Sequence, residues 1–275
     1  MTGATVVIVP CFNEADRLRP SDFGDYLDRN PGVRFLFVND GSTDRTQAVI
    51  DGMHELSGGR VHSVRLARNL GKAEAVRLGM LEAMTLDPQR VGYWDADLST
   101  PLASIAALCR ALEESGASVA LGARVKLLGR LVERKAYRHY LGRVFATMAS
   151  IALGAAVYDT QCGAKMFRND DALKRVMAVP FRVGWTFDVE ILGRYKIVKG
   201  REGVSLERCV VEVPLAEWRH VPGSKITPAD VMVCGLEALR LLLIFRCPPV
   251  SGAYASRFID KTAPATPGRV AARST

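Results

Sequence analysis

Acidic side chains follow three apolar segments that have the composition of buried β-strands. Residues 10–14 read PCFNE, residues 40–44 read DGSTD and residues 95–97 read DAD. Ligands of open parallel sheets bind at the carboxyl ends of the strands, so we expect these acids to share one crevice. Neighbouring carboxylates repel each other, and such a cluster therefore predicts a bound cation or a polar ligand.

Asp95 and Asp97 are the candidate metal ligands. Two carboxylates one residue apart offer oxygen ligands to Mg²⁺ or Mn²⁺ and leave other coordination positions to water and substrate phosphate. The alternative is that each acid caps the helix that follows it, which is the favoured interpretation of Asp44. For Asp95 and Asp97 we favour the metal site, because they follow an apolar strand and share a crevice with two other acidic turns.

The elements that must position these residues alternate between strands and helices. Strands are expected at 5–10, 34–39, 61–66, 91–94 and 117–121. Helices fall between them, one capped by Ser42 or Thr43, one around residues 75–83 and one opened by Thr100 and Pro101. This alternation predicts the α/β class, with a Rossmann-like, mostly parallel central sheet and flanking helices.

The second half of the chain is less regular. Helices are expected from Asp170 to Met177, at 187–197 and from Thr227 to Phe245, and a strand at 205–213. Residues 247–275 are rich in Pro, Ala, Ser, Thr and Arg, and we expect a flexible tail there.

Composition excludes several classes of protein. The 275 residues are 48% hydrophobic, which is enough to fill a core and excludes a disordered chain. No apolar run reaches the roughly 20 residues that a membrane span needs. The 6 cysteines lie far apart without a CxxC motif, which is typical of reduced cytosolic thiols, and the 4 histidines show no zinc-binding spacing.

The net charge of +8 comes largely from one segment. Residues 124–143 hold seven Arg and Lys against the single acid Glu133. Such local basicity favours a docking surface for an anionic membrane and a phosphate headgroup, with a solvated helix face as the alternative. Nucleic acid is less favoured, because no stacking platform or known reader motif accompanies the segment.

Four ordered segments resemble the nucleotide-sugar-binding half of family 2 glycosyltransferases with the GT-A fold: VVIVPCFNEADRL, FLFVNDGSTDRT, ARNLGKAEAVRLGM and YWDADLSTP. Three later segments, DTQCGAKMF, WTFDVEIL and EWRHVPGSKI, resemble dolichyl-phosphate β-glucosyltransferases and their polyprenyl-phosphate relatives. The resemblance implies one glycosyltransferase domain over 1–246, with a nucleotide-sugar-binding half (1–122) and an acceptor-binding half (123–246).

The resemblance also implies roles for individual residues. Nucleotide-sugar binding would involve Pro10, Phe12, Glu14, Asp40, Lys72, Asp95, Ala96, Asp97, Arg219 and Lys225. Arg124 and Arg138 would hold the acceptor phosphate, and the catalytic set would be Asp97, Arg124, Arg138 and Asp188. A solvated surface lysine is the alternative for Lys72, and a helix cap or core ion pair is the alternative for Asp188. The family's metal-assisting glutamine is Ser99 here, and its aromatic residue after Gly163 is Ala164.

The activity expected from the resemblance is metal-dependent, inverting transfer of a sugar, with UDP-glucose favoured as donor, onto a polyprenyl or dolichyl phosphate. We expect a peripheral protein at the cytoplasmic face of the inner membrane. Residues 144–158 and 231–245 are apolar enough to lie at such an interface, although core packing is the favoured alternative for both. The other candidate functions are a GDP-mannose-dependent polyprenyl-phosphate mannosyltransferase, a family 2 transferase with a soluble acceptor, and a nucleotide-sugar-binding module without catalysis.

Overall fold

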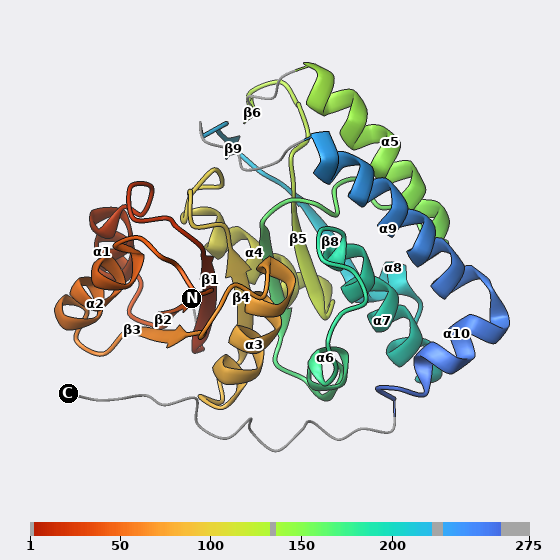
Figure 1. Ribbon diagram of the computed structural model, residues 1–275, viewed down its shortest axis with the longest axis horizontal. Helices are drawn as coiled ribbons and strands as arrows, with labels where there is room; N and C mark the ends of the chain where they lie inside the picture. The colour runs from red at the N-terminus through yellow and green to blue at the C-terminus, as the bar shows by residue number, and fades with distance from the viewer. Residues whose placement is uncertain (1–2, 133–135, 222–227, 260–275) are drawn as a thin grey trace.

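The chain folds around a seven-stranded mixed sheet (Figure 1). This computed structural model describes residues 3–132, 136–221 and 228–259. The strand order is β3-β2-β1-β4-β7-β5-β8, with β1 to β4 parallel to one another. The strands are β1 (Thr5–Cys11), β2 (Val33–Asn39), β3 (Val61–Arg65), β4 (Arg90–Trp94), β5 (Val119–Ala123), β7 (Ala164–Arg168) and β8 (Val210–Pro214). The short strands β6 (Leu131–Val132) and β9 (Glu217–Trp218) form a separate parallel pair.

Helices cover both faces of the sheet (Figure 1). Successive residues of a strand point to opposite faces, so Ile8 of β1 enters one hydrophobic core while Val7 and Val9 enter the other. The first core is completed by α3, α5, α6, α7, α9 and α10, and the second by α1, α2 and α4. The helices are α1 (Pro20–Arg29), α2 (Thr46–Leu56), α3 (Lys72–Met84), α4 (Ser104–Ser115), α5 (Ala136–Leu153), α6 (Asp171–Met177), α7 (Phe187–Arg201), α8 (Leu206–Cys209), α9 (Pro228–Arg246) and α10 (Pro248–Ala255).

The predicted α/β class and mostly parallel sheet are confirmed, and the five predicted strands of the first half all form within two residues of their expected bounds. The central strand β7 was not expected. It runs antiparallel to both of its neighbours, β4 and β5. Its second residue, Lys165, is only 1% exposed, and a charged residue in a five-residue run hid the strand from the sequence pattern.

Two predicted helix starts are wrong. The helix expected after Ser42 or Thr43 begins at Thr46, because the Oγ of Ser42 accepts the N–H of Asn13 at 3.0 Å instead of capping a helix. The helix expected at Thr100 begins at Ser104, and the Thr100 carbonyl accepts the indole N–H of Trp94 at 2.7 Å.

The prediction for 205–213 is also partly wrong, since α8 occupies its first half and only β8 is extended. The helix expected from Asp170 to Met177 is confirmed, and Asp170 is its N-cap, because its carboxylate accepts the N–H of Leu173. Thr227 lies outside the described residues.

The segment after residue 247 is not a loose tail along its whole length. Pro248–Ala255 form α10, which packs against α9, and Tyr254 and Phe258 are buried. The Tyr254 hydroxyl donates to Glu190, and the guanidinium of Arg194 donates to that hydroxyl at 2.7 Å. The sequence prediction failed here because small residues and two prolines surround the few apolar side chains that pack. Of the described helices, none is both long and apolar enough to cross a membrane.

Removing the Tyr254 hydroxyl tests whether α10 is part of the folded core. We expect Tyr254→Phe to lower the free energy of unfolding by about 1.5–3 kcal/mol, because the hydroxyl bonds two buried charged groups. Urea denaturation measures this loss, with the partly exposed Tyr158→Phe as control. Equal effects of the two substitutions would show that α10 adds no specific stability.

Candidate active site

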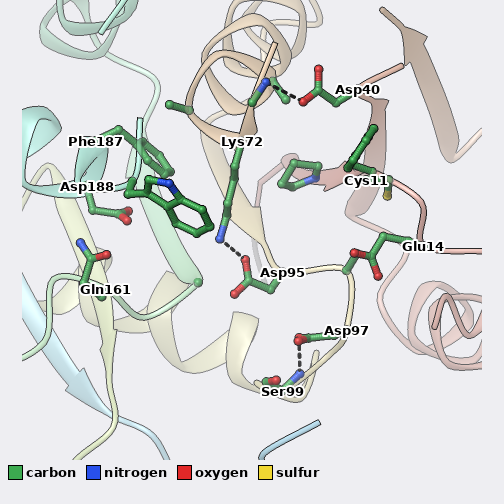
Figure 2. Close-up of a pocket in the computed structure, with 18 of the residues that line it drawn as sticks. Cys11, Glu14, Asp40, Lys72, Asp95, Asp97, Ser99, Gln161, Phe187 and Asp188 are labelled. Carbon is green, nitrogen blue, oxygen red and sulfur yellow. Dashed lines mark hydrogen bonds and ion pairs between the residues drawn. The ribbon is translucent and has the colours of Figure 1, made fainter. Parts of the chain in front are cut away.

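A cavity of about 740 Å³ lies at the carboxyl ends of the parallel strands (Figure 2). Most of the predicted site residues line it, although they come from both halves of the chain. They are Pro10, Phe12, Glu14, Asp40, Lys72, Asp95, Ala96, Asp97, Arg124 and Asp188. The expectation of one shared crevice is therefore confirmed for the three acidic segments.

Asp40 fixes the loop that leads into α3. Its carboxylate accepts the N–H groups of Leu70 and Gly71 at 2.7 and 2.9 Å. Burial raises the pKa of the Asp40 carboxyl above its ordinary value, and these two N–H groups only partly oppose the rise. Gly71 adopts a φ of 88° immediately before the helix, a conformation that glycine adopts without steric cost.

Lys72 and Asp95 form an ion pair inside the cavity (Figure 2). The Nζ of Lys72 lies 2.5 Å from Oδ1 of Asp95, and the lysine side chain is 44% exposed. Burial lowers the pKa of Lys72, but the carboxylates of Asp95, Asp188 and Asp97 raise it by more, so the ammonium is held in its charged form. Lys72 is thus exposed, as the alternative of a solvated lysine expects, but it lines the cavity and is paired with Asp95.

Asp97 lies one turn further along, where Oδ1 accepts the N–H of Ser99 at 3.0 Å. Leu98 between them has a φ of 52°, in the left-handed region that nonglycine residues rarely adopt. This tight turn points the carboxylates of Asp95 and Asp97 toward the cavity (Figure 2).

The two aspartates fit a divalent cation that shares its ligands with substrate. Within the described part of the chain, no group of three or more His, Cys, Asp or Glu side chains is arranged to hold a metal by itself. A cation at Asp95 and Asp97 would thus take its remaining oxygen ligands from water and phosphate, as Mg²⁺ commonly does. Lys72 already pairs with Oδ1 of Asp95, so a cation bound here would share this carboxylate with the lysine.

Because Gly163 has no side chain, the carboxylate of Asp95 can lie directly against it. The Asp95 N–H donates to the Gly163 carbonyl at 2.9 Å, and a Cβ on Gly163 would lie 1.8 Å from Oδ2 of Asp95. We expect Gly163→Ala to displace this carboxylate and to lower kcat/KM for transfer by roughly 10²-fold, since misplacing a catalytic group by about 1 Å has that effect. A steady-state assay measures the loss. Gly200→Ala is the control, because its Cβ would meet nothing within 4 Å.

Two acidic residues hold Arg124 at the cavity: Asp159 directly, and Glu212 through the backbone that carries Asp159. Its Nε and Nη2 donate to the two carboxylate oxygens of Asp159 at 2.7 and 2.8 Å. Glu212 in turn accepts the N–H groups of Tyr158 and Asp159 at 2.9–3.0 Å. Burial lowers the pKa of Arg124, and the Asp159 carboxylate raises it by more, so the guanidinium stays charged. The Cζ atom of the Arg124 guanidinium also lies 5.4 Å from the centre of the Trp218 ring.

Asp188 is both a cavity residue and a member of a buried ion pair. Its Oδ1 lies 2.7 Å from Nζ of Lys165 and accepts the hydroxyl of Tyr93. Burial and then the Asp188 carboxylate raise the pKa of the Tyr93 phenol well above its ordinary value, so the phenol keeps its proton. The core ion pair left open by the sequence is thus present, while Asp188 still lines the cavity.

Three predicted residues are not brought into this cavity by the described structure. The Nε of Arg219 lies 2.5 Å from Glu217, and its side chain lines a second cavity of about 510 Å³. Lys225 lies outside the described residues. Arg138 belongs to α5, and its side chain lies outside the described part.

Sequence reasoning missed several residues that line the cavity. Trp185, Trp218, His220 and Asp230 all do so, and Arg17 joins them through its contact with Glu14 at 2.5 Å. Two signals were available, because Trp185 directly precedes the FDVE segment and Trp218 and His220 flank Arg219 in EWRHV.

Comparison with known proteins places the chain in a family. Residues 6–176 match the family described as Glycosyl transferase family 2, which covers more than half of the chain. The chain belongs to this family, as the sequence resemblance predicted, and it has the GT-A fold. It is therefore a glycosyltransferase.

Named relatives align along most of the chain. Dolichyl-phosphate beta-glucosyltransferase of Saccharomyces cerevisiae is 28% identical over 269 residues, covering 90% of this chain and 75% of the relative. Polyprenol monophosphomannose synthase of Mycolicibacterium smegmatis is 26% identical over 231 residues, covering 84% and 83%. Glucosyl-3-phosphoglycerate synthase from Mycobacterium tuberculosis, crystallised with Mn²⁺, UDP-glucose and phosphoglyceric acid, superposes with a TM-score of 0.59 at 19% identity, over 88% of this chain and 79% of that one. This last likeness concerns the fold alone.

Proposed function

We propose that this glycosyltransferase moves glucose from UDP-glucose onto a polyprenyl or dolichyl phosphate, with inversion and with Mg²⁺ or Mn²⁺ bound by Asp95 and Asp97. The observation that carries the proposal is the convergence of these two carboxylates, Lys72 and Arg124 on one cavity of about 740 Å³. A family relative that covers 90% of the chain is a dolichyl-phosphate glucosyltransferase by name, which supports glucose as the sugar and a dolichyl-type phosphate as the acceptor.

The nucleoside end of the donor would lie against Pro10, Phe12, Glu14 and Asp40. Phe12 offers an apolar face, and the two carboxylates accept hydrogen bonds from base N–H or ribose O–H groups. The diphosphate would then reach Lys72 and Asp95. A divalent cation there would offset the negative charge that develops on the leaving nucleoside diphosphate.

The reaction we propose is a single displacement. An acceptor phosphate oxygen forms a bond to the anomeric carbon, while the bond from that carbon to the β-phosphate oxygen breaks and its electron pair leaves with UDP. The second pKa of a phosphate monoester is about 6, so the nucleophile is mostly ionised at neutral pH and needs no strong base. The protein must instead bring two anions together, which positive side chains achieve by positioning and neutralisation.

The acceptor phosphate would approach from the side of Arg124, where the basic residues of 124–143 begin. Arg138 stays a prediction from the sequence. Asp188 would accept hydrogen bonds from sugar hydroxyls, because its carboxylate is fixed by Lys165 and Tyr93 at the cavity wall. If the acceptor were a sugar hydroxyl instead, Asp188 would be the first candidate for general base.

We further propose that α9 contacts the cytoplasmic face of the inner membrane. Met232, Leu236, Leu239 and Leu243 recur at the spacing of one helix face and are exposed, Leu236 to 63%. Arg240 and Arg246 are exposed on the same helix. An apolar row beside arginines matches the lipid interface and the anionic headgroups of a membrane.

Placing charges on this row should release the protein from lipid. We expect the double substitution Leu236→Glu and Leu239→Glu to weaken binding to vesicles with anionic lipid at least about 10-fold, because two apolar anchors become acidic. Vesicle co-sedimentation measures the binding, and Leu56→Glu on α2, whose leucine is 90% exposed, is the matched control. Equal weakening of vesicle binding by the substitutions on α9 and on α2 would contradict the proposed contact between α9 and the membrane.

A panel of donors tests the proposed activity. The purified chain is incubated with UDP-glucose or GDP-mannose, with Mg²⁺ or Mn²⁺, and with a short polyprenyl phosphate or a soluble phosphorylated acceptor. We expect a lipid-linked product from UDP-glucose that disappears with EDTA. Product only from GDP-mannose would favour the activity in the name of the M. smegmatis relative, and product only on the soluble acceptor would reject the lipid assignment. Nucleotide binding without product from any donor would favour a nucleotide-sugar-binding module without catalysis.

A further inference from the structure

Glu237 of α9 holds three consecutive backbone amides of a distant segment. The N–H groups of Gly184, Trp185 and Thr186 donate to its two carboxylate oxygens at 2.7, 3.0 and 2.9 Å. The hydroxyl of Thr186 donates to the same carboxylate at 3.0 Å. Hydrogen bonds to an ionised acceptor are about twice as strong as neutral ones, so one side chain fixes this stretch of backbone.

The two amides that precede these are held by a second carboxylate. The N–H groups of Arg182 and Val183 donate to Oε2 of Glu190 at 2.7 and 3.2 Å. The other oxygen of Glu190, which is fully buried, bonds Arg194 and the hydroxyl of Tyr254. Every backbone N–H from residue 182 to residue 186 therefore donates to a glutamate carboxylate. The two glutamates belong to different helices, Glu190 to α7 and Glu237 to α9.

The segment held in this way forms a wall of the active-site cavity. Gly184, Trp185, Phe187 and Asp188 all line the cavity, and Trp185 is 40% exposed. Figure 2 shows Phe187 and Asp188 on one side of Lys72, with Glu14, which follows β1, and Asp95, which follows β4, on the other. Whatever occupies the cavity between these sides meets the held segment.

We propose that Glu237 is a positioning residue, which fixes residues 184–186 so that Trp185 and Asp188 face the bound sugar. Glu237 does not line the cavity among the described residues, so its effect on substrate passes through the backbone it holds. That the ligand facing Trp185 and Asp188 is the donor sugar rests on the proposed function. Losing the carboxylate leaves three amides without their acceptor, and a wall displaced by about 1 Å can lower turnover by roughly 10²-fold.

Glu237→Gln tests this role, because glutamine has the same shape but presents an N–H₂ donor to amides that need acceptors. Hydrogen exchange followed by mass spectrometry reports on the segment without any substrate. We expect exchange of the amides at 184–186 to rise at least about 10-fold, and kcat/KM for the donor to fall about 10-fold to 100-fold.

Two control variants separate positioning from general stability. Glu202→Gln removes a surface glutamate at the end of α7 that pairs with Lys199, and it should change neither readout. Ile244→Val trims the buried face of α9 about two turns beyond Glu237, and it should lower Tm but leave exchange at 184–186 and kcat/KM near wild type.

The possible outcomes are distinct. Unchanged exchange at 184–186 in Glu237→Gln would overturn the positioning role, as would an equal loss of kcat/KM in Ile244→Val at the same Tm. If the wild-type protein transfers no sugar from any donor, the proposed function fails. The exchange measurement still decides whether Glu237 holds the segment.

Discussion

Replacing Asp97 by asparagine is expected to abolish sugar transfer while leaving the fold intact. Oδ1 of Asp97 accepts the N–H of Ser99 at 3.0 Å, and asparagine keeps an oxygen at that place, so the turn is retained. The substitution removes one of the two negative charges proposed to bind the divalent cation. A loss of about 4 kcal/mol of transition-state stabilisation corresponds to roughly 10³-fold in kcat/KM.

The measurement is steady-state transfer across a range of Mn²⁺ concentrations, together with Tm. The control is Asp171→Asn in the first turn of α6, where the aspartate side chain is 84% exposed. We expect this control to keep wild-type transfer. An Asp97→Asn protein that retained more than about a tenth of the activity would contradict the metal role, since an amide oxygen is a much weaker ligand than a carboxylate.

Replacing Arg124 by alanine is expected to destabilise the protein as well as to impair catalysis. The Arg124 and Asp159 side chains are only 14% and 7% exposed, so the substitution removes a bidentate partner from a buried carboxylate. Breaking such a buried pair typically lowers the free energy of unfolding by about 3–5 kcal/mol. Chemical denaturation of Arg124→Ala measures this loss directly.

A double-mutant cycle isolates the pair. Asp159→Asn removes the buried charge, so the double variant should be more stable than the sum of the single effects indicates, by about 2 kcal/mol. Additive effects would show that the two side chains are not energetically coupled. They would also weaken the view that Asp159 and Glu212 hold Arg124 at the acceptor side of the cavity.

The acidic side of the active site could be predicted from the sequence because each acid directly follows a strand. Continuous apolar runs such as 5–10 and 91–94 locate parallel strands, and parallel strands bring their carboxyl ends to one edge. The contact between Lys72 and Asp95 was beyond this reasoning, because it depends on how α3 enters after a loop held by Asp40.

The opposite wall of the cavity was much harder to predict. It depends on β7, which carries a buried lysine, and on Glu190 and Glu237, which look like ordinary surface residues in their helices. Their partners are backbone amides, and sequence patterns contain no signal for such pairs. The same limit explains α10, whose place is set by Tyr254 reaching the pair of Glu190 and Arg194.

The central claim is that the cavity binds a nucleoside diphosphate whose charge is shared by a cation at Asp95 and Asp97. A crystal soaked with UDP and Mn²⁺ and measured for anomalous scattering tests it most directly. We predict nucleotide density along Pro10, Phe12 and Asp40, with one manganese peak in contact with the two carboxylates. Nucleotide bound elsewhere, or a manganese peak away from both aspartates, would contradict the claim.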